Sequence, residues 1–178
     1  MTRMHTTLVL GGARSGKSTF AEQLASQSGL DRIFLATGLA LDDEMSTRIA
    51  YHRSQRSEAW LTIEEPLRIA EAIGRESSAT RILVVDCLTL WLSNLMHAGL
   101  EPSKEADGLI ASLGGSAGPV ILVSNEVGLG IVPQTPLGRA FRDAQGRLNQ
   151  RLAMAVGDVV FVAAGLPLWL KRTPPVPN

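Results

Sequence analysis

The sequence predicts an α/β fold in which a mostly parallel β-sheet carries helices on both faces. Short apolar runs rich in β-branched residues alternate along the chain with segments that have helical spacing. Strands separated by helices indicate βαβ crossovers, which place the strands parallel and the helices against the sheet. Strands are expected at residues 6–10, 32–36, 81–86, 119–124 and 158–163, and helices at 17–28, 42–56, 66–76, 88–98, 104–113 and 137–155.

Length and composition favour a single domain. The 178 residues are 45% hydrophobic, which is enough to bury one full core. We therefore expect one domain over residues 1–172 and a frayed tail over residues 173–178. The 17 basic residues balance the 17 acidic ones, so no overall field attracts nucleic acid or an anionic membrane.

The chain also lacks the sequence features of secreted and membrane proteins. Its longest apolar region, "ILVVDCLTLWLSNLM", is too short and too polar to cross a bilayer, and the N-terminus has no secretory signal pattern. The single cysteine, Cys87, cannot form an internal disulfide. These features predict a cytoplasmic protein.

The strongest motif is "GGARSGKS" at residues 11–18, which follows a predicted strand and opens a predicted helix. Its glycines let backbone N–H groups turn toward phosphate oxygens at a helix N-terminus. Lys17 is expected to bridge the β- and γ-phosphates, and the Ser18 hydroxyl to bind Mg²⁺. An ordinary glycine turn is disfavoured by the flanking strand and helix. The predicted nucleotide-binding P-loop consists of Gly11, Gly12, Ala13, Arg14, Ser15, Gly16, Lys17 and Ser18.

Asp86, at the end of the predicted strand "RILVVD", is expected to act together with the P-loop. A carboxylate there can hold a Mg²⁺-bound water against the phosphates. Alternatively, Asp86 caps the helix that follows, and the two roles can coexist. These motifs predict a P-loop NTPase-like protein that binds a Mg²⁺ nucleotide, which describes kinases, molecular switches and ATP-driven motors alike.

A third candidate is His52, in the predicted basic helix of residues 42–56. Arg48, His52 and Arg56 share one face at i, i+4 spacing, and Arg53 is adjacent. Nearby positive charges disfavour protonation of the imidazole, which leaves a lone pair suited to attack on phosphorus. From this segment alone, a solvated basic face with an incidental histidine is nevertheless favoured.

Two later segments carry polar residues. Residues 124–133, "SNEVGLGIVP", predict a structured loop at the active edge of the sheet. The helix after it places Arg142, Gly146, Asn149 and Gln150 near one stripe. That stripe indicates either close approach by a ligand or neighbouring subunit, or a plain exposed helix with charge pairs.

In combination the motifs resemble one family along nearly the whole chain, the bifunctional adenosylcobinamide kinase / adenosylcobinamide-phosphate guanylyltransferases of vitamin B12 biosynthesis. The resemblance is carried by "GGARSGKS", "ATGLALDDEM", "RIAYHRSQR", "WLTIEEP", "DCLTLWLSN", "SNEVGLGIVP", "RAFRDAQGRLNQRLA" and "GLPLWLK". It implies phosphorylation of adenosylcobinamide with ATP or GTP, followed by transfer of GMP from GTP to adenosylcobinamide phosphate. It further implies a homotrimer.

The resemblance also implies roles for single residues. It makes His52 the nucleophile that carries the guanylyl group. The P-loop chemistry makes Lys17 the second catalytic candidate and places Mg²⁺ at Ser18 and Asp86. Glu64 is preferred to Glu65 because it is the first carboxylate after "WLT". Beyond the P-loop, the implied nucleotide-binding residues are Ala36, Thr37, Gly38, Arg53, Ser54, Gln55, Arg56, Glu64 and Asp86.

Two other functions stay open at this level. A P-loop kinase of another small alcohol would need no histidine nucleophile, and a nucleotide-dependent switch would need no acceptor substrate. Labelling of the enzyme by α-labelled GTP distinguishes the first alternative, and analysis of the products formed with adenosylcobinamide distinguishes the second.

Overall fold

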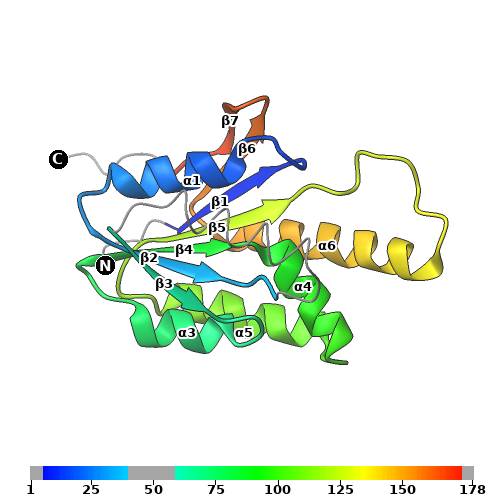
Figure 1. Cartoon of the computed structure of the whole chain (residues 1–178), viewed down its shortest axis with the longest axis horizontal. Helices are drawn as coiled ribbons and strands as arrows, with labels where there is room; N and C mark the ends of the chain where they lie inside the picture. The colour runs from blue at the N-terminus through cyan, green and yellow to red at the C-terminus, as the bar shows by residue number, and fades with distance from the viewer. Residues whose placement is uncertain (1–5, 40–58, 174–178) are drawn as a thin grey trace.

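A seven-stranded sheet forms the centre of the computed structural model, which describes residues 6–39 and 59–173 (Figure 1). The strand order is β3-β2-β4-β5-β1-β6-β7, and every neighbouring pair is parallel except β6 and β7. The strands are β1 (Thr6–Gly11), β2 (Asp31–Ala36), β3 (Trp60–Glu64), β4 (Arg81–Asp86), β5 (Val120–Asn125), β6 (Asp158–Ala163) and β7 (Leu166–Lys171).

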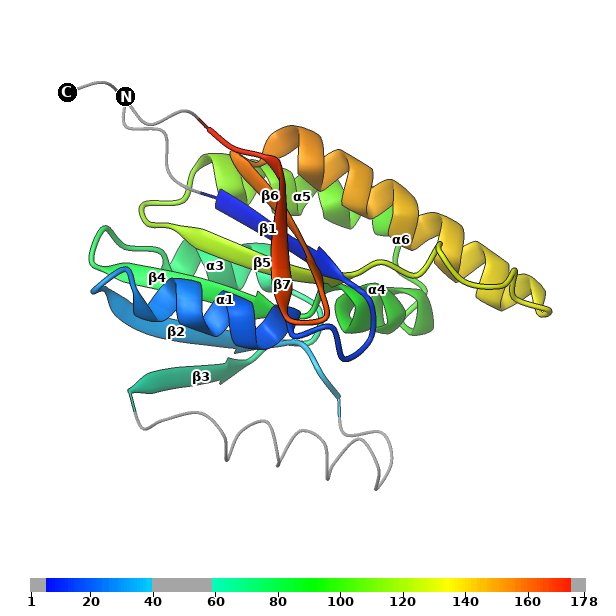
Figure 2. The same cartoon turned by 90° about the horizontal axis from the view of Figure 1, so that it is seen from above.

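The helices cover both faces of this sheet, as the alternation of strands and helices predicts (Figures 1 and 2). Of the described helices, α1 packs against one face of the sheet, whereas α3, α4, α5 and α6 pack against the opposite face (Figure 2). The helices are α1 (Lys17–Ser26), α3 (Ile69–Glu76), α4 (Leu88–His97), α5 (Pro102–Gly114) and α6 (Pro136–Ala155).

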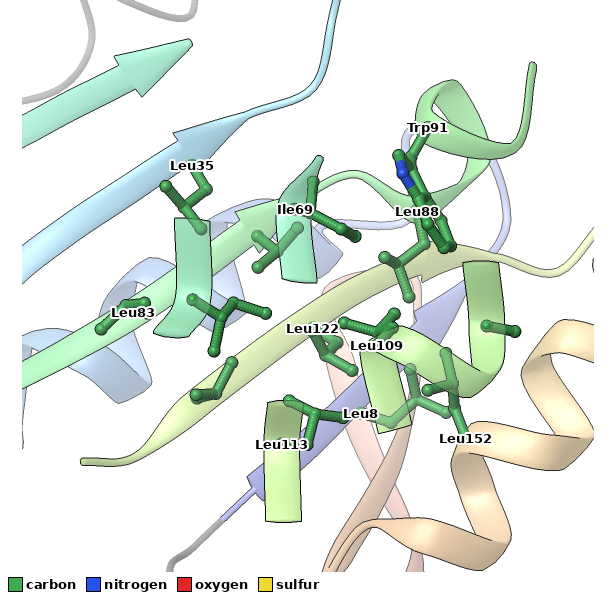
Figure 3. Packing of buried hydrophobic residues seen from close by; sticks show 14 of the residues in the cluster. Leu8, Leu35, Ile69, Leu83, Leu88, Trp91, Leu109, Leu113, Leu122 and Leu152 are labelled. Atoms are coloured by element: carbon green, nitrogen blue, oxygen red, sulfur yellow. The ribbon is translucent and has the colours of Figure 1, made fainter. Parts of the chain in front are cut away.

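Two separate apolar layers hold the helices to the sheet. Successive strand residues alternate between them, so that in β5 Leu122 belongs to the layer under α3 to α6 and Val123 to the layer under α1. Figure 3 shows part of the larger layer, including Trp91 of α4. Trp91 is 1% exposed, and its indole N–H donates to the carbonyl of Leu67 at 2.8 Å. Burial on both faces explains why the central strands are almost continuously apolar.

The sequence-based prediction missed the strands at both edges of the sheet. β3 extends the parallel sheet beside β2, and its side chains are only partly buried. β7 returns antiparallel to β6 through Ala164 and Gly165, both with positive φ, which is the geometry of a two-residue hairpin turn. Pro167 is tolerated in β7 because an edge strand need not donate every N–H to a neighbour.

No described helix has the length and apolar character that crossing a bilayer requires. Of the predicted helices, the one at residues 42–56 lies outside the described residues. The remaining predicted helices and the five predicted strands match observed elements, with differences at their ends such as α1, which ends at Ser26 rather than residue 28.

We expect Gly118→Ala to lower the free energy of unfolding by about 1–3 kcal/mol, because a methyl group there would overlap the backbone carbonyls of Ser78 and Arg81. These carbonyls belong to the chain entering β4, where Arg81 N–H donates to Ser78 O at 3.1 Å, so they cannot move aside without breaking that turn. Urea denaturation followed by circular dichroism measures the change.

The matched control for this prediction is Gly108→Ala. Gly108 is exposed within α5, and a methyl group there would meet no atom within 4 Å. This substitution is expected to raise the free energy of unfolding by about 0.5–1 kcal/mol, since alanine favours the helix. Equal effects of the two substitutions would contradict the steric argument.

Candidate functional site

The carboxyl ends of five parallel strands meet at one edge of the sheet and bring most of the predicted site residues together. In the register of the strands, Ala36 of β2 pairs with Glu64 of β3 on one side and with Asp86 of β4 on the other. Gly11 of β1 pairs with Asn125 of β5. The edge is therefore a row of strand ends that runs from Glu64 to the P-loop.

The P-loop is packed tightly against the hairpin of β6 and β7. A methyl group on Gly11 would come within 2.5 Å of both Ser15 Oγ and Val162 O, so no larger residue fits there. Gly165, at the hairpin tip, donates its N–H to Ser15 O at 2.8 Å. Gly16 has φ 94°, a conformation that favours glycine, and its Cα faces Gly165. The β6–β7 hairpin thus packs against the P-loop and holds its backbone in place.

Lys17 and Ser15 are poised for an anion at the N-terminus of α1. Lys17 is the first residue of α1, and its ammonium group donates to Gly12 O at 3.0 Å, which keeps the charge on the loop. Ser15 Oγ is buried and has no hydrogen-bond partner among the described residues. The Ser15 hydroxyl is therefore able to donate a hydrogen bond to a phosphate oxygen of a ligand. The positive end of the α1 dipole also attracts an anion.

Asp86 lies on the same face of the sheet as α1. In β4, Val84 belongs to the apolar layer under α1, and Asp86 follows it by two residues and so shares its face. The helix-capping alternative is not observed, since the N-cap position of α4 is Cys87 and that helix has no side-chain cap hydrogen bond. The carboxylate is therefore placed toward the nucleotide side of the sheet, two strands away from the P-loop strand.

Thr37 joins the ends of β2 and β4. Its hydroxyl donates to Cys87 O at 2.7 Å and accepts from Cys87 N at 2.8 Å, and its own N–H donates to Asp86 O at 3.2 Å. Asn94 of α4 donates to Thr37 O at 2.8 Å. Because Thr37 is completely buried, its side chain positions the backbone beside Asp86, while Ala36 and Gly38 on either side of it are partly exposed.

The two adjacent glutamates at the end of β3 differ in their environments. The Glu65 carboxylate accepts from the N–H groups of Leu67 at 3.1 Å and Arg68 at 2.8 Å, so it holds the turn that leads into α3. Glu64 is exposed at the strand end, in register with Ala36. Glu65 therefore has a structural role in this turn, and Glu64 lies in the row of strand ends.

Other predicted site residues lie outside the described residues. These are the nucleophile candidate His52 and its neighbours Arg53, Ser54, Gln55 and Arg56.

The polar stripe predicted on α6 divides between the core and the surface. Arg142 pairs with Asp143, and Gln150 is exposed, which agrees with the interpretation as an exposed face with charge pairs. Asn149, in contrast, is buried and donates to Asn125 O at 3.0 Å. Sequence reasoning also missed Gln145, which is completely buried and donates to Ser124 Oγ and Asn149 Oδ1 at 2.9 and 3.1 Å. Its position four residues before Asn149, on the face that also carries Leu148 and Leu152, was the signal that could have identified it.

The site fits Mg²⁺ carried by a nucleotide better than a metal held by the protein alone. Within residues 6–39 and 59–173, no group of three or more His, Cys, Asp or Glu is arranged to hold a metal. Mg²⁺ needs only one or two protein oxygens when phosphates and waters complete its shell. Ser18 in the first turn of α1 and Asp86 on the same sheet face supply that chemistry.

Comparison with known proteins gives one consistent family. Residues 7–170 match the family model described as cobinamide kinase / cobinamide phosphate guanyltransferase. The bifunctional adenosylcobalamin biosynthesis protein CobP of Pseudomonas aeruginosa is 49% identical over 170 residues, covering 94% of this chain and 98% of that protein. The corresponding protein CobU of Escherichia coli is 38% identical, covering 92% of this chain and 98% of its own length.

A solved structure of a Pyrococcus horikoshii protein shares the fold. Its TM-score is 0.58 at 12% sequence identity, and the match covers 96% of this chain and 87% of the other. This similarity supports the α/β architecture alone, while the family match over residues 7–170 carries the functional relationship.

We expect Cys87, next to Asp86, to resist alkylation and to make stability depend on alkaline pH. Burial, together with the nearby charge of Asp86, raises the pKa of its thiol from the ordinary value of 9.0 to about 11. Between pH 9 and 11 the unfolded chain loses this proton and the native protein keeps it. The free energy of unfolding therefore falls over that range, by at most about 1.4 kcal/mol per pH unit, and is unaffected below it.

Two measurements check this prediction. Iodoacetamide labelling at pH 8 should be slow in the native protein and complete in urea. Denaturation at several pH values measures how far the free energy of unfolding falls between pH 9 and 11. This fall should be smaller in Cys87→Ala, because the variant has no thiol to titrate. Rapid labelling of the native protein would show that the thiol is accessible.

Proposed function

The chain belongs to the cobinamide kinase / cobinamide phosphate guanyltransferase family, and we propose that its P-loop edge holds the nucleotide for the transfer reactions. The protein is a bifunctional enzyme of adenosylcobalamin biosynthesis, with a kinase and a guanylyltransferase activity. The observation that carries the proposal is the common placement of Lys17 and Asp86, at the carboxyl edge of the sheet and on the face covered by α1.

In the kinase reaction, the P-loop residues Gly11 to Ser18 bind the phosphates of ATP or GTP. The backbone N–H groups at the start of α1 and the Lys17 ammonium group stabilise the charge that spreads over the γ-phosphoryl oxygens during transfer. The substrate hydroxyl forms a bond to the γ-phosphorus as the bond to the nucleoside diphosphate breaks. Positioning and charge stabilisation suffice for this reaction, so no covalent intermediate is needed.

Mg²⁺ is the cofactor that we assign to Ser18 and Asp86. When bound at these residues, the ion would offset negative charge on the phosphates of the nucleotide. The Ser18 hydroxyl would bind the ion directly, and the Asp86 carboxylate would hold one of its waters.

In the guanylyl transfer, we assign the nucleophile to His52. Its imidazole nitrogen forms a bond to the α-phosphorus of GTP, and pyrophosphate leaves; an oxygen of cobinamide phosphate then attacks the same phosphorus and releases the histidine. Arg53 and Arg56 would stabilise the departing pyrophosphate. The resemblance to the family motif "RIAYHRSQR" supports this assignment.

The remaining assigned contacts concern the nucleoside. Glu64 is a suitable partner for guanine, because a carboxylate accepts hydrogen bonds from both the ring N1–H and the exocyclic amino group. Its exposed position beside Ala36 and Gly38 supports this role. Ser54 and Gln55 are assigned to the nucleotide with the two arginines that flank them.

We also propose that the enzyme is a cytoplasmic homotrimer. The resemblance to the family supports the trimer, and apolar side chains that are 58–97% exposed in the described part of the chain give it surface to bury: Leu129, Ile131, Val132, Leu137, Met154, Leu166, Leu168 and Leu170. Its place in a biosynthetic family supports the cytoplasmic location.

We expect His52→Asn to abolish guanylyl transfer and to retain phosphorylation of cobinamide, because asparagine cannot form the phosphoramidate bond. Incubation with α-labelled GTP should give a labelled, acid-labile adduct in the native enzyme and none in the variant. The control is phosphorylation of cobinamide from γ-labelled ATP. Equal loss of both activities in a folded variant, or an undiminished adduct, would refute the assignment.

Sedimentation equilibrium tests the oligomeric state. We expect a mass three times the 19.0 kDa of the chain, in both the presence and the absence of GTP. A monomer mass at the concentrations used in the activity assays would refute the homotrimer.

A further inference from the structure

The end of β5 occupies the space between the phosphate cradle and Asp86. Asn125 is the last residue of β5 and pairs in register with Gly11 of the P-loop strand, while Val123 of the same strand pairs with Asp86. Adjacent strands lie about 4.8 Å apart, so β5 places Asn125 between the two parts of the nucleotide site. Val123 belongs to the apolar layer under α1, and Asn125, two residues later, shares that face.

The backbone of Asn125 is held from three directions. Its N–H donates to Thr89 Oγ1 of α4 at 2.9 Å, and its carbonyl accepts from Asn149 Nδ2 of α6 at 3.0 Å. The N–H of the next residue, Glu126, donates to Gly11 O at 3.0 Å and ties the same strand end to the P-loop. A side chain on so constrained a backbone has a defined position before any ligand binds.

The support behind this position is a network of buried polar side chains on the other face of the sheet. Ser124 Oγ donates to Asn149 Oδ1 at 2.7 Å, and Gln145 Nε2 donates to both of them. Ser124 and Gln145 are completely buried. This network orients Asn149 toward the carbonyl of Asn125 and makes no use of the Asn125 side chain.

The side-chain oxygen of Asn125 is left without a partner. Among the described residues, three buried side-chain atoms lack a hydrogen bond: Ser15 Oγ, Asn125 Oδ1 and Gln145 Oε1. The first two lie at the same edge of the sheet, one in the P-loop and one beside it in register. Since burying an acceptor without a donor destabilises a protein, an acceptor kept at this edge is expected to meet a donor supplied by a ligand.

The ligand groups that the two reactions bring to this site differ in what they can offer the Asn125 oxygen. The oxygens of the nucleotide phosphates are acceptors at neutral pH and do not satisfy a carboxamide oxygen. Cobinamide supplies a hydroxyl that must approach the γ-phosphorus, and a hydroxyl donates one hydrogen bond. We propose that Asn125 is a further catalytic residue of the kinase reaction, whose carboxamide positions the attacking hydroxyl against the γ-phosphorus; this rests on the proposed function.

Asn125 acts in the reaction by positioning the reacting groups. Its Oδ1 accepts the hydroxyl hydrogen, which directs a lone pair of the hydroxyl oxygen at the phosphorus, and its NH₂ group can donate to an oxygen of the phosphoryl group being transferred. The carboxamide takes no proton: as the new O–P bond forms and the nucleoside diphosphate leaves, the hydroxyl proton passes to an oxygen of the product phosphate and then to water.

Two variants test the proposal. Asn125→Leu keeps a side chain of similar shape without hydrogen bonds, and Asn125→Ala removes it. Each should lower kcat for phosphorylation of cobinamide by about 10- to 100-fold, with the KM for ATP within about twofold of the native value, since the contact is needed for attack rather than for nucleotide binding. Formation of the labelled adduct from α-labelled GTP without cobinamide should be retained, because no hydroxyl takes part.

A control separates this role from a loss of stability. Ser116→Ala removes a buried hydroxyl that bonds Ser77 Oγ and Gly118 O at the amino-terminal edge of the sheet. It should lower the melting temperature and leave kcat unchanged. The proposal is overturned if both Asn125 variants retain kcat, or if phosphorylation and adduct formation fall together. Failure of the native enzyme to phosphorylate cobinamide or to form the adduct would instead refute the proposed function.

Discussion

The in-register ends of five parallel strands are the constraint on which the site depends. Hydrogen bonds between strands align Glu64, Ala36 and Asp86 in one row, and Gly11 with Asn125 in the next. A slip of one residue would turn each of these side chains to the opposite face of the sheet. Thr37 prevents such a slip between β2 and β4, since its hydroxyl bonds both the N–H and the carbonyl of Cys87.

The buried polar groups behind this row serve two different purposes. Thr37 and Asn149 have their hydrogen-bonding groups joined to backbone or side chains of the fold, and they make the strand ends rigid. Ser15 and Asn125 each retain a buried oxygen without a partner in the described part of the chain. The unfavourable free energy of such atoms, about 1–3 kcal/mol each, is tolerated most readily where a ligand restores the bond.

Local signals in the sequence were enough to predict the central sheet and the phosphate cradle. The P-loop is contiguous, and the buried strands carry unbroken apolar runs, so neither needs knowledge of distant contacts. The edge strands β3 and β7 were missed because each is covered on fewer sides and carries exposed residues such as Leu61 and Leu168. The sequence placed Asn125 only within a loop at the active edge of the sheet, and the hydrogen bonds of Asn125 and Gln145 could not be predicted because their partners lie on other elements.

The packing of Gly11 changes what its motif means. The first glycine of the P-loop lacks room for a side chain because two protein atoms approach it, Val162 O of the β6–β7 hairpin and Ser15 Oγ. Its retention in a descendant of this chain would therefore report an intact hairpin as much as an intact nucleotide site. A duplicated copy that had lost ATP binding altogether would still carry this glycine for as long as the hairpin remained folded against the loop. The P-loop glycines alone therefore do not show that a related chain binds a nucleotide or is an active enzyme.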